Sequence, residues 1–213
     1  DSLRLLRARL PHAAVTLPDG EAHKTLDTVR GLYDAFLDAG LERSGAVIAL
    51  GGGVIGVMAG FAAATYLRGV ALVQAPTTLL AMADASLGGK VGVDLPRGKN
   101  LVGTSVRPLF VAADTETLET LPPVELRNGL AEVVKCALIG DPALLAELEA
   151  GAEPVTPDHI RRAAAVKLAI VAEDPHERGR RLLLNLGHTF AHGLELASGY
   201  ALPHGQAVAI LDD

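Results

Sequence analysis

The chain has 213 residues, 49% of them hydrophobic and only 3% aromatic, and its formal net charge is −6 at pH 7. An acidic chain with scattered basic residues offers no support for nucleic-acid binding or for attachment to an anionic membrane surface. The single Cys136 excludes an intrachain disulfide framework, and no apolar segment is long enough to span a bilayer. We therefore expect a soluble, cytoplasmic globular protein.

In the first half of the chain, predicted strands alternate with predicted helices. In chain order we expect a helix at 2–10, a strand at 12–17, a helix at 25–39, a strand at 46–50, a helix at 57–64, a strand at 70–75, a helix at 77–85 and a strand at 110–113. Thr77 or Thr78 is expected to cap the helix that follows them. This alternation is typical of an α/β domain with a mostly parallel, Rossmann-like sheet.

The second half is expected to be helical, with no predicted strand. The helices are predicted at 125–139, 142–150, 158–173 and 186–198. The pattern changes after Thr115, so we place an α/β domain at residues 1–115 and an all-α domain at residues 116–213. The chain opens within a predicted helix and closes on one barely begun, so we expect it to be shortened at both ends compared with its relatives.

Three of the seven histidines lie close together in the sequence, at His188, His192 and His204. His188 and His192 are four residues apart and share one face of a helix, whereas His204 follows a short loop. A catalytic zinc site needs about three protein ligands, and neutral imidazoles are preferred among them. The best additional ligand is Glu132, a lone acid in an apolar helical run. The clustering favours a metal site over the alternative of surface histidines and a solvated glutamate.

A glycine-rich turn at residues 51–56 lies between a predicted strand and a predicted helix. Its G-x-G-x-x-G spacing is suited to backbone contact with a pyrophosphate at a helix N-terminus. The acid expected about twenty residues later in a standard dinucleotide-binding fold is absent, because Ala71 and Leu72 lie there. The turn alone therefore indicates dinucleotide binding only weakly.

Cationic side chains follow this turn along the chain. Lys90 and the segment 98–100, which contains Lys99, are predicted to lie in glycine-flanked loops, which suits the two lysines to bind a phosphate or a carboxylate. Lys135 comes three residues after Glu132 and shares its helical face. Further donors precede the histidines: Lys167, Arg181 and Asn185. A metal surrounded by cations suits an anionic, polyhydroxylated substrate, whereas the alternative is that the lysines are merely solvated.

Seven motifs stand out along the chain. They are GGGVIG at 51–56, AGFAAATYLRG at 59–69, PTTLLA at 76–81, DASLGGK at 84–90, GKNLVG at 98–103, GLAEVVK at 129–135 and NLGHTFAH at 185–192. In this combination and order they closely resemble the 3-dehydroquinate synthase family, and the resemblance covers almost the whole chain.

The resemblance implies an α/β NAD-binding domain followed by a helical metal-binding domain. It implies a lyase of the shikimate pathway of aromatic amino acid biosynthesis, which converts 3-deoxy-D-arabino-heptulosonate 7-phosphate to 3-dehydroquinate and phosphate. In that family, bound NAD oxidises a ring hydroxyl transiently, which acidifies the neighbouring C–H so that phosphate leaves. The ketone is then reduced, the ring opens and an intramolecular aldol reaction follows. A bound Zn²⁺ or Co²⁺ holds the reacting oxygen.

The resemblance also implies roles for individual residues. The implied metal ligands are Glu132, His188 and His204, and His192 bonds to or exchanges protons with groups near the metal. The implied substrate-site residues are Asp84, Lys90, Asn100, Lys135, Lys167, Arg181 and Asn185. Arg68 reaches a neighbouring subunit's site, which implies a homodimer. The implied cofactor-site residues are Glu21, Lys24, Gly52, Gly53, Thr77, Thr78, Asp84, Lys90 and Lys99.

Several positions depart from the family pattern. Val57 replaces an Asp that contacts the nicotinamide end of NAD, and a valine cannot accept that hydrogen bond. The segment 104–106 replaces a stretch that contains an aromatic residue, Ala191 replaces a Gly and Gln206 replaces a Glu. Two alternatives therefore stay open: another NAD-dependent sugar phosphate cyclase, or a non-catalytic or truncated relative that binds metal without turnover. A metal-dependent alcohol dehydrogenase is less favoured, because it would not need so many lysines and arginines.

Overall fold

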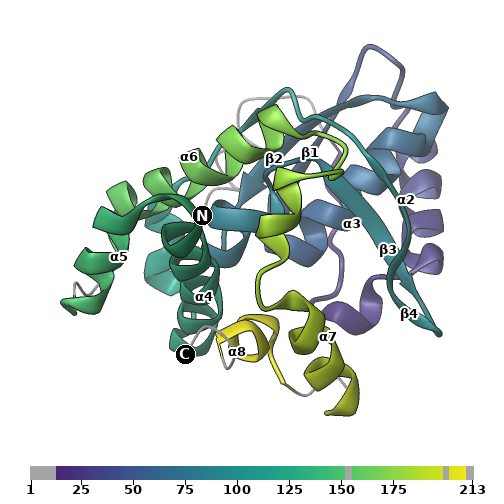
Figure 1. Cartoon of the computed structure of the whole chain (residues 1–213). Coiled ribbons are helices and arrows are strands. Elements are labelled where there is room, and N and C mark those ends of the chain that lie inside the picture. The colour runs from purple at the N-terminus through teal and green to yellow at the C-terminus, as the bar shows by residue number, and fades with distance from the viewer. Residues whose placement is uncertain (1–12, 152–154, 199–201, 210–213) are drawn as a thin grey trace. The chain divides into compact units, whose positions relative to one another are not determined.

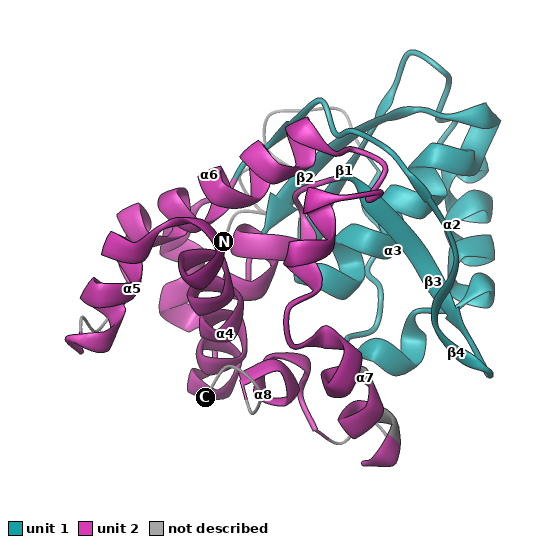
Figure 2. Ribbon diagram, viewed as in Figure 1, with its two compact units in different colours: residues 1–76, 89–112 teal, residues 77–88, 113–213 magenta. Residues whose placement is uncertain are grey.

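The computed structural model describes residues 13–151, 155–198 and 202–209, apart from the side chains of His192 and Leu196. The chain forms two compact units, coloured separately in Figure 2. The first contains the described residues up to 76 together with 89–112, and the second contains 77–88 and the described residues from 113 onward. The segment 77–88 therefore groups with the later helices. The cofactor-binding role for residues 1–115 and the metal-binding role for 116–213 stay predictions.

A three-stranded parallel sheet organises the first unit (Figure 1). Its strands are β1 (Ala46–Gly51), β2 (Ala71–Pro76) and β5 (Phe110–Val111), in the order β1-β2-β5. Ala46 lies opposite Ala71 and Gly51 opposite Pro76, so β1 and β2 pair over their whole length. The helix α3 (Gly53–Thr65) connects these two strands, as the predicted alternation requires.

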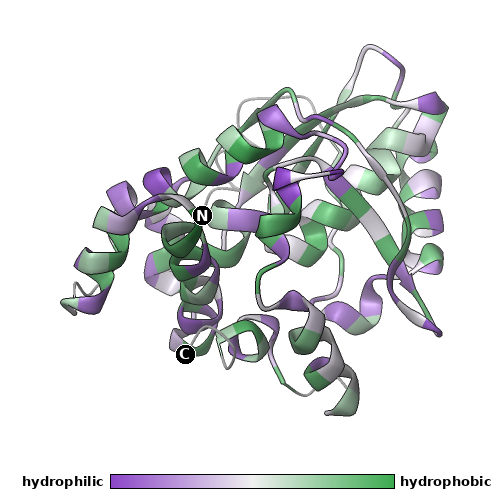
Figure 3. Cartoon of the chain, in the orientation of Figure 1, coloured by the Kyte–Doolittle hydropathy of each residue, from purple (hydrophilic) through white to green (hydrophobic). Residues whose placement is uncertain are grey.

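The two long helices of the first unit differ in how much of their surface is apolar. In α2 (Leu26–Asp38), the side chain of Thr25 caps the first turn by accepting a hydrogen bond from the backbone N–H of Thr28 at 3.2 Å. Val29, Leu32 and Phe36 are buried on one face of α2, so it is an amphipathic surface helix. By contrast, α3 is hydrophobic or nearly neutral along its length (Figure 3). This helix packs against strands of the sheet and is largely buried.

An antiparallel hairpin completes the first unit. It consists of β3 (Lys90–Leu95) and β4 (Gly98–Ser105), with Lys90 opposite Ser105. The helix α3 packs closely on β3 at Gly60, where an added Cβ would lie 2.6 Å from Cγ1 of Val91. The packing of the hairpin on α3 therefore requires a glycine at position 60.

We expect Gly60→Ala to lower the free energy of unfolding by about 1–3 kcal/mol, because the new methyl group overpacks the contact with Val91. The matched control is Gly31→Ala in α2, where an added Cβ would meet no neighbouring group within 4 Å. This change should raise the free energy of unfolding by about 0.5–1 kcal/mol, because alanine is more favourable than glycine within a helix. Chemical denaturation of both variants measures the two effects. Equal stability changes would contradict the close approach at Gly60.

The second unit is helical. Its helices are α4 (Pro123–Gly140), α5 (Pro142–Glu149), α6 (Pro157–Glu173), α7 (His188–Ala197) and α8 (His204–Ala209). Short 3₁₀ segments lie at Thr115–Thr120 and Arg180–Asn185, and a π-helical turn, η3, lies at Ala81–Ala85. Its largest core joins η3, α4, α5 and α6 through residues such as Met82, Val133 and Ile160. Within the described part of the chain, none of the helices combines the length and apolarity needed to cross a bilayer.

Several local predictions differ from the structure. The helix predicted at 2–10 lies outside the described residues. The strand predicted at 12–17 is wrong over its described part, 13–17, which has no regular secondary structure. Residues 13–16 are exposed, and β propensity stabilises a strand only where neighbours pack against it. Lys90 and the segment 98–100 were predicted to lie in loops, but they belong to the hairpin strands.

Candidate functional site

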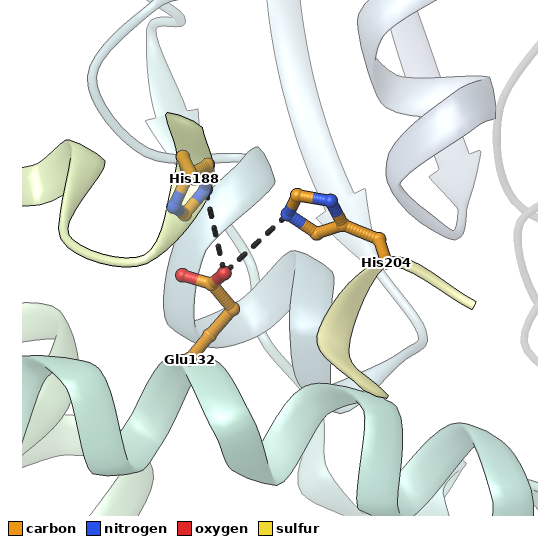
Figure 4. Close-up of side chains that lie close together, drawn as sticks. All are labelled: Glu132, His188 and His204. Atoms are coloured by element: carbon orange, nitrogen blue, oxygen red, sulfur yellow. Dashed lines mark ion pairs between the residues drawn. The ribbon is translucent and has the colours of Figure 1, made fainter. Parts of the chain in front are cut away.

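Three side chains from separate helices of the second unit point toward one another (Figure 4). Glu132 lies on α4 and is 0% exposed, whereas His188 and His204 are the first residues of α7 and α8. Oε1 of Glu132 lies 3.7 Å from Nε2 of His188 and 3.5 Å from Nε2 of His204. One ligand atom from each of the three residues, called the triad below, lies within 4.8 Å of the other two. This spacing is small enough for one ion to contact all three.

The donor set of the triad fits a divalent metal ion. One carboxylate and two imidazoles match a three-ligand catalytic zinc site that keeps a further position open. Oε1 of Glu132 is buried and accepts no hydrogen bond from the described residues. Buried carboxylate oxygens are normally satisfied, so this atom calls for a partner. A cation beside the two imidazole nitrogens would supply one.

Close backbone approaches bring the triad together. At the start of α8, the backbone N–H of Gly205 donates a hydrogen bond to Oδ1 of Asn128 on α4. A Cβ at position 205 would collide with the Asn128 carbonyl, so a glycine is required directly after His204. On α4, next to Asn128, Gly129 lies so close to the backbone of Leu80 that no side chain would fit at position 129. These two approaches place α8 and the segment before η3 against α4.

The two histidines of the triad have opposite pKa shifts. Burial lowers the pKa of His188 and outweighs the favourable field of Glu132. Burial also disfavours the charged form of His204, but the carboxylates of Glu132 and Glu195 outweigh it and raise the pKa of His204 to about 9. His204 therefore lies between two acids, one on α4 and one on α7.

A charged network adjoins the triad. Lys135 is 1% exposed and contacts the Glu132 carboxylate directly, and its Nζ lies 3.5 Å from Oδ1 of Asp84 on η3. Lys167 on α6 donates to both Oδ1 and the backbone carbonyl of Asp84, at 2.6 and 2.8 Å. Three predicted substrate-site residues, Asp84, Lys135 and Lys167, thus lie together. The π-helical turn that carries Asp84 is a rare conformation that occurs often at functional sites.

The charges of this network stabilise one another. Burial raises the pKa of Asp84, but Lys167 and Lys135 overcome that effect and hold the pKa well below its usual range. Burial lowers the pKa of Lys135, yet Asp84 and Glu132 shift the pKa above its usual value. Asp84 and Lys135 are therefore both charged at neutral pH, and Lys135 provides a cation beside the triad for an anionic ligand.

Arg181 and Asn185 lie on the 3₁₀ segment before α7. The Arg181 guanidinium is buried and donates to the backbone carbonyls of Pro175 and Gly88, at 2.8 and 2.9 Å. Asn185 is exposed and donates to Oε1 of Glu177 at 2.7 Å. In this conformation, Arg181 supports the loop that contains Gly88, and the Asn185 amide is bonded to a residue that precedes its own 3₁₀ segment.

A second polar cluster lies in the first unit. Lys24 is buried, and its Nζ donates to Oδ1 of Asn100 at 2.7 Å and to Oε1 of Glu21 at 3.1 Å. Asp94 accepts a hydrogen bond from the Asn100 backbone at 2.7 Å, and Lys99 pairs with Glu21 at 3.5 Å. The structure therefore brings together four of the predicted residues around Asp94, an acid that was not predicted from the sequence.

The other predicted residues occupy several places in the fold. Gly52 caps α3 without a side-chain bond and Gly53 is its first residue, so the glycine turn opens a helix as predicted. Thr78 accepts a hydrogen bond from the Ala81 backbone at 3.2 Å, which confirms one of the two predicted caps, and Thr77 precedes it. Lys90 and Arg68 are exposed in the first unit, where Arg68 has a left-handed φ of 64°. His192 lies in α7, but its side chain is outside the described residues.

Asp94 and Glu195 were not predicted from the sequence. Glu195 is seven residues after His188 and therefore two turns along the same face of α7. Its Oε1 lies 3.5 Å from Nδ1 of His204. Helical spacing could have identified Glu195, whereas Asp94 offered only an acid next to a turn that contains a proline and a glycine.

Comparisons with known proteins find matches along nearly all of the chain. The sequence matches the 3-dehydroquinate synthase N-terminal family over residues 14–128 and the 3-dehydroquinate synthase C-terminal family over residues 129–210. A curated 3-dehydroquinate synthase from Methylococcus capsulatus is 53% identical over 205 residues, which cover 92% of this chain and 57% of that protein.

Two solved structures share the fold at lower identity. A 2-epi-5-epi-valiolone synthase from Streptomyces hygroscopicus subsp. jinggangensis, with NAD⁺ and Zn²⁺ bound, has a TM-score of 0.86 at 35% identity over 91% of this chain and 57% of that one. A 2-deoxy-scyllo-inosose synthase complexed with carbaglucose-6-phosphate, NAD⁺ and Co²⁺ has a TM-score of 0.86 at 33% identity. That match covers 98% of this chain and 60% of the other chain. The chain thus spans less than two thirds of the length of these relatives.

Proposed function

Because the chain belongs to the 3-dehydroquinate synthase family, we propose that it converts 3-deoxy-D-arabino-heptulosonate 7-phosphate to 3-dehydroquinate and phosphate, with NAD and a divalent metal as cofactors. The observation that carries this proposal is the triad, whose buried Glu132 contacts the buried Lys135, with a second buried lysine, Lys167, bonded to Asp84 beside them. A lone metal site or a lone basic cluster would suit many functions. Their combination suits a substrate that has both hydroxyl groups to hold and an anion to release.

The cofactors supply chemistry that side chains lack. A divalent ion on the triad would polarise a bound oxygen as a Lewis acid, and NAD would accept and return a hydride. Glu132, His188 and His204 would hold the ion. Glu21 and Lys24 would bind the adenosine end of NAD, and the start of α3 at Gly52 and Gly53 would face its phosphates. Thr77, Thr78 and Lys99 would be further contacts to NAD.

The charged network would bind and orient the substrate. Lys135 and Lys167 have donors suited to an anionic or hydroxyl group, and Asp84 fixes both ammonium groups at 2.6–3.5 Å. Arranging these groups before the substrate arrives lowers the ordering cost at the moment of reaction. Lys90, Asn100, Arg181 and Asn185 are the other proposed substrate contacts, and His192 is the proposed proton-transfer residue.

A different sugar phosphate cyclase activity is the second candidate. The fold similarity to the valiolone and inosose synthases supports it, but their identities of 35% and 33% are well below the 53% to a 3-dehydroquinate synthase. The half-buried Val57 on α3 motivates the third candidate, a relative that binds metal without turnover, because valine cannot accept the hydrogen bond that an Asp would.

We further propose that the protein is a cytoplasmic homodimer. Cys136 is the single cysteine of the chain and is buried as a free thiol, so no intrachain disulfide can form, which is usual for a protein of a reducing compartment. The exposed Arg68 is available to a second subunit.

The test is phosphate release from the heptulosonate phosphate by metal-stripped protein, with NAD and Zn²⁺ added back separately and together. We expect release only when both are present. Glucose 6-phosphate and other phosphorylated sugars, assayed in parallel, separate this activity from that of another sugar phosphate cyclase.

Two results would contradict the proposal. Release from one of the other sugar phosphates alone would assign the chain to another cyclase. No release from protein that retains zinc would favour the non-catalytic candidate, and Val57→Asp then tests whether the altered cofactor contact is responsible.

A further inference from the structure

We propose that Glu195 is a positioning residue, which orients His204 so that its Nε2 atom is directed at the metal. The inference rests on the proposed function only in using the proposed metal site. Glu195 lies on α7 and is 2% exposed, and its Oε1 lies 3.5 Å from Nδ1 of His204 on α8. It lies on the side of the imidazole ring away from Glu132.

The two imidazoles of the triad share one arrangement. In each ring Nε2 faces Oε1 of Glu132, at 3.7 Å for His188 and 3.5 Å for His204. In each ring Nδ1 faces an acceptor, which is the Leu186 carbonyl at 2.9 Å for His188 and the Glu195 carboxylate for His204. Figure 4 shows the two rings directed at the same carboxylate from α7 and α8. The repetition indicates that the two contacts at Nδ1 have a common purpose.

That purpose follows from the chemistry of imidazole. A neutral ring has one N–H and one lone pair, and an acceptor at Nδ1 keeps the proton there, so that Nε2 offers its lone pair to a metal. Outer-shell acceptors also fix the ring orientation and increase the basicity of the ligand. A carboxylate orients the ring and increases its basicity more strongly than a carbonyl, because the negative carboxylate attracts the partly positive N–H of a metal-bound ring.

The contact with His204 explains how the carboxylate of Glu195 can be buried. A buried carboxylate costs free energy unless it is paired, and His204 is a partner that metal binding leaves in place. The packing of Ala191 against Ala207 and Val208 holds α7 and α8 together. Thus α7 supplies one metal ligand, His188, and also the group that positions the ligand on α8.

The experiment compares Glu195→Gln and Glu195→Ala with the unmodified protein. Zn²⁺ affinity is measured by competition with a chromophoric chelator, and the visible absorption of Co²⁺-loaded protein reports the coordination geometry. We expect the Kd for Zn²⁺ to rise by about 10-fold in Glu195→Gln and about 100-fold in Glu195→Ala, the range for loss of an outer-shell partner. The Co²⁺ spectrum should change in both variants.

The control is Ile160→Val, in the core of the second unit away from α7 and α8, which lowers stability by about 0.5–1.5 kcal/mol. It should leave the Zn²⁺ affinity and the Co²⁺ spectrum unchanged. If Glu195→Ala does not fold, the isosteric Glu195→Gln decides alone. Unchanged Zn²⁺ affinity in Glu195→Gln and Glu195→Ala would overturn the inference but not the proposed function. Failure of the unmodified protein to bind Zn²⁺ or Co²⁺ would overturn both.

Discussion

Replacement of His188 by alanine is expected to weaken Zn²⁺ binding by more than about 100-fold, the upper limit for an outer-shell partner, because it removes a direct ligand. Of the triad, Glu132 and His204 would remain, and two protein ligands are fewer than the three of a catalytic zinc site. The measurement is the zinc retained after dialysis against a chelator, quantified by atomic absorption. Phosphate release should disappear together with the zinc.

The matched control is His176→Ala. His176 is an exposed histidine of the second unit that lies outside the triad. It should retain as much zinc as the unmodified protein. Undiminished zinc in His188→Ala would remove His188 from the ligand set, and equal losses in the two variants would indicate non-specific binding by surface histidines.

The helices of the second unit were predicted well because their signals are local. The structure confirms the helices predicted at 125–139, 142–150 and 158–173, with end differences of one or two residues. Asp141 and Thr156 cap α5 and α6 with their side chains, and a proline occupies the first turn of each. Caps, prolines and apolar periodicity all lie within a few residues of the element they define, so they can be read without tertiary structure.

The hairpin was missed although β3 alternates in sequence. Val91, Val93 and Leu95 alternate with Lys90, Gly92 and Asp94, which is the period of a strand. The glycines in and around it indicated a loop instead. These glycines are in fact required by close packing, since an added Cβ on Gly92 would lie 2.6 Å from the Val102 carbonyl of β4. A local sequence cannot distinguish a glycine of a loop from one that allows two strands to approach.

Sequence spacing and residue type predicted the three residues of the triad, but they could not predict which side chains contact the triad. Glu132 was nominated as a lone acid in an apolar helix, and the structure brings it to His188 and His204. The contact of Glu195 with His204 depends on how α7 packs against α8. The Lys135 contact with Glu132 was implied by helical spacing, whereas its approach to Asp84 depends on the fit of η3 against α4.

Replacement of Lys135 by methionine is expected to lower the free energy of unfolding of the metal-free protein by about 3–5 kcal/mol. Methionine is an apolar chain of similar length, so the packing is largely kept while the charge is lost. Glu132, which is 0% exposed, would lose its closest cation, and Asp84 would keep only Lys167. Arg161→Met, which removes an exposed ion pair with Asp158, should change stability little.

The same variant tests whether the triad accepts a cation. A metal ion beside Glu132 would replace part of the positive charge that Lys135 supplied, so Zn²⁺ should raise the Tm of Lys135→Met by more than it raises the Tm of the unmodified protein. Thermal unfolding of both proteins with and without Zn²⁺, with Arg161→Met in parallel, measures the difference. An equal rise in Tm would mean that Lys135 and the metal do not interact with the same carboxylate. An unchanged Tm in the metal-free variant would mean that the buried pair contributes nothing to stability.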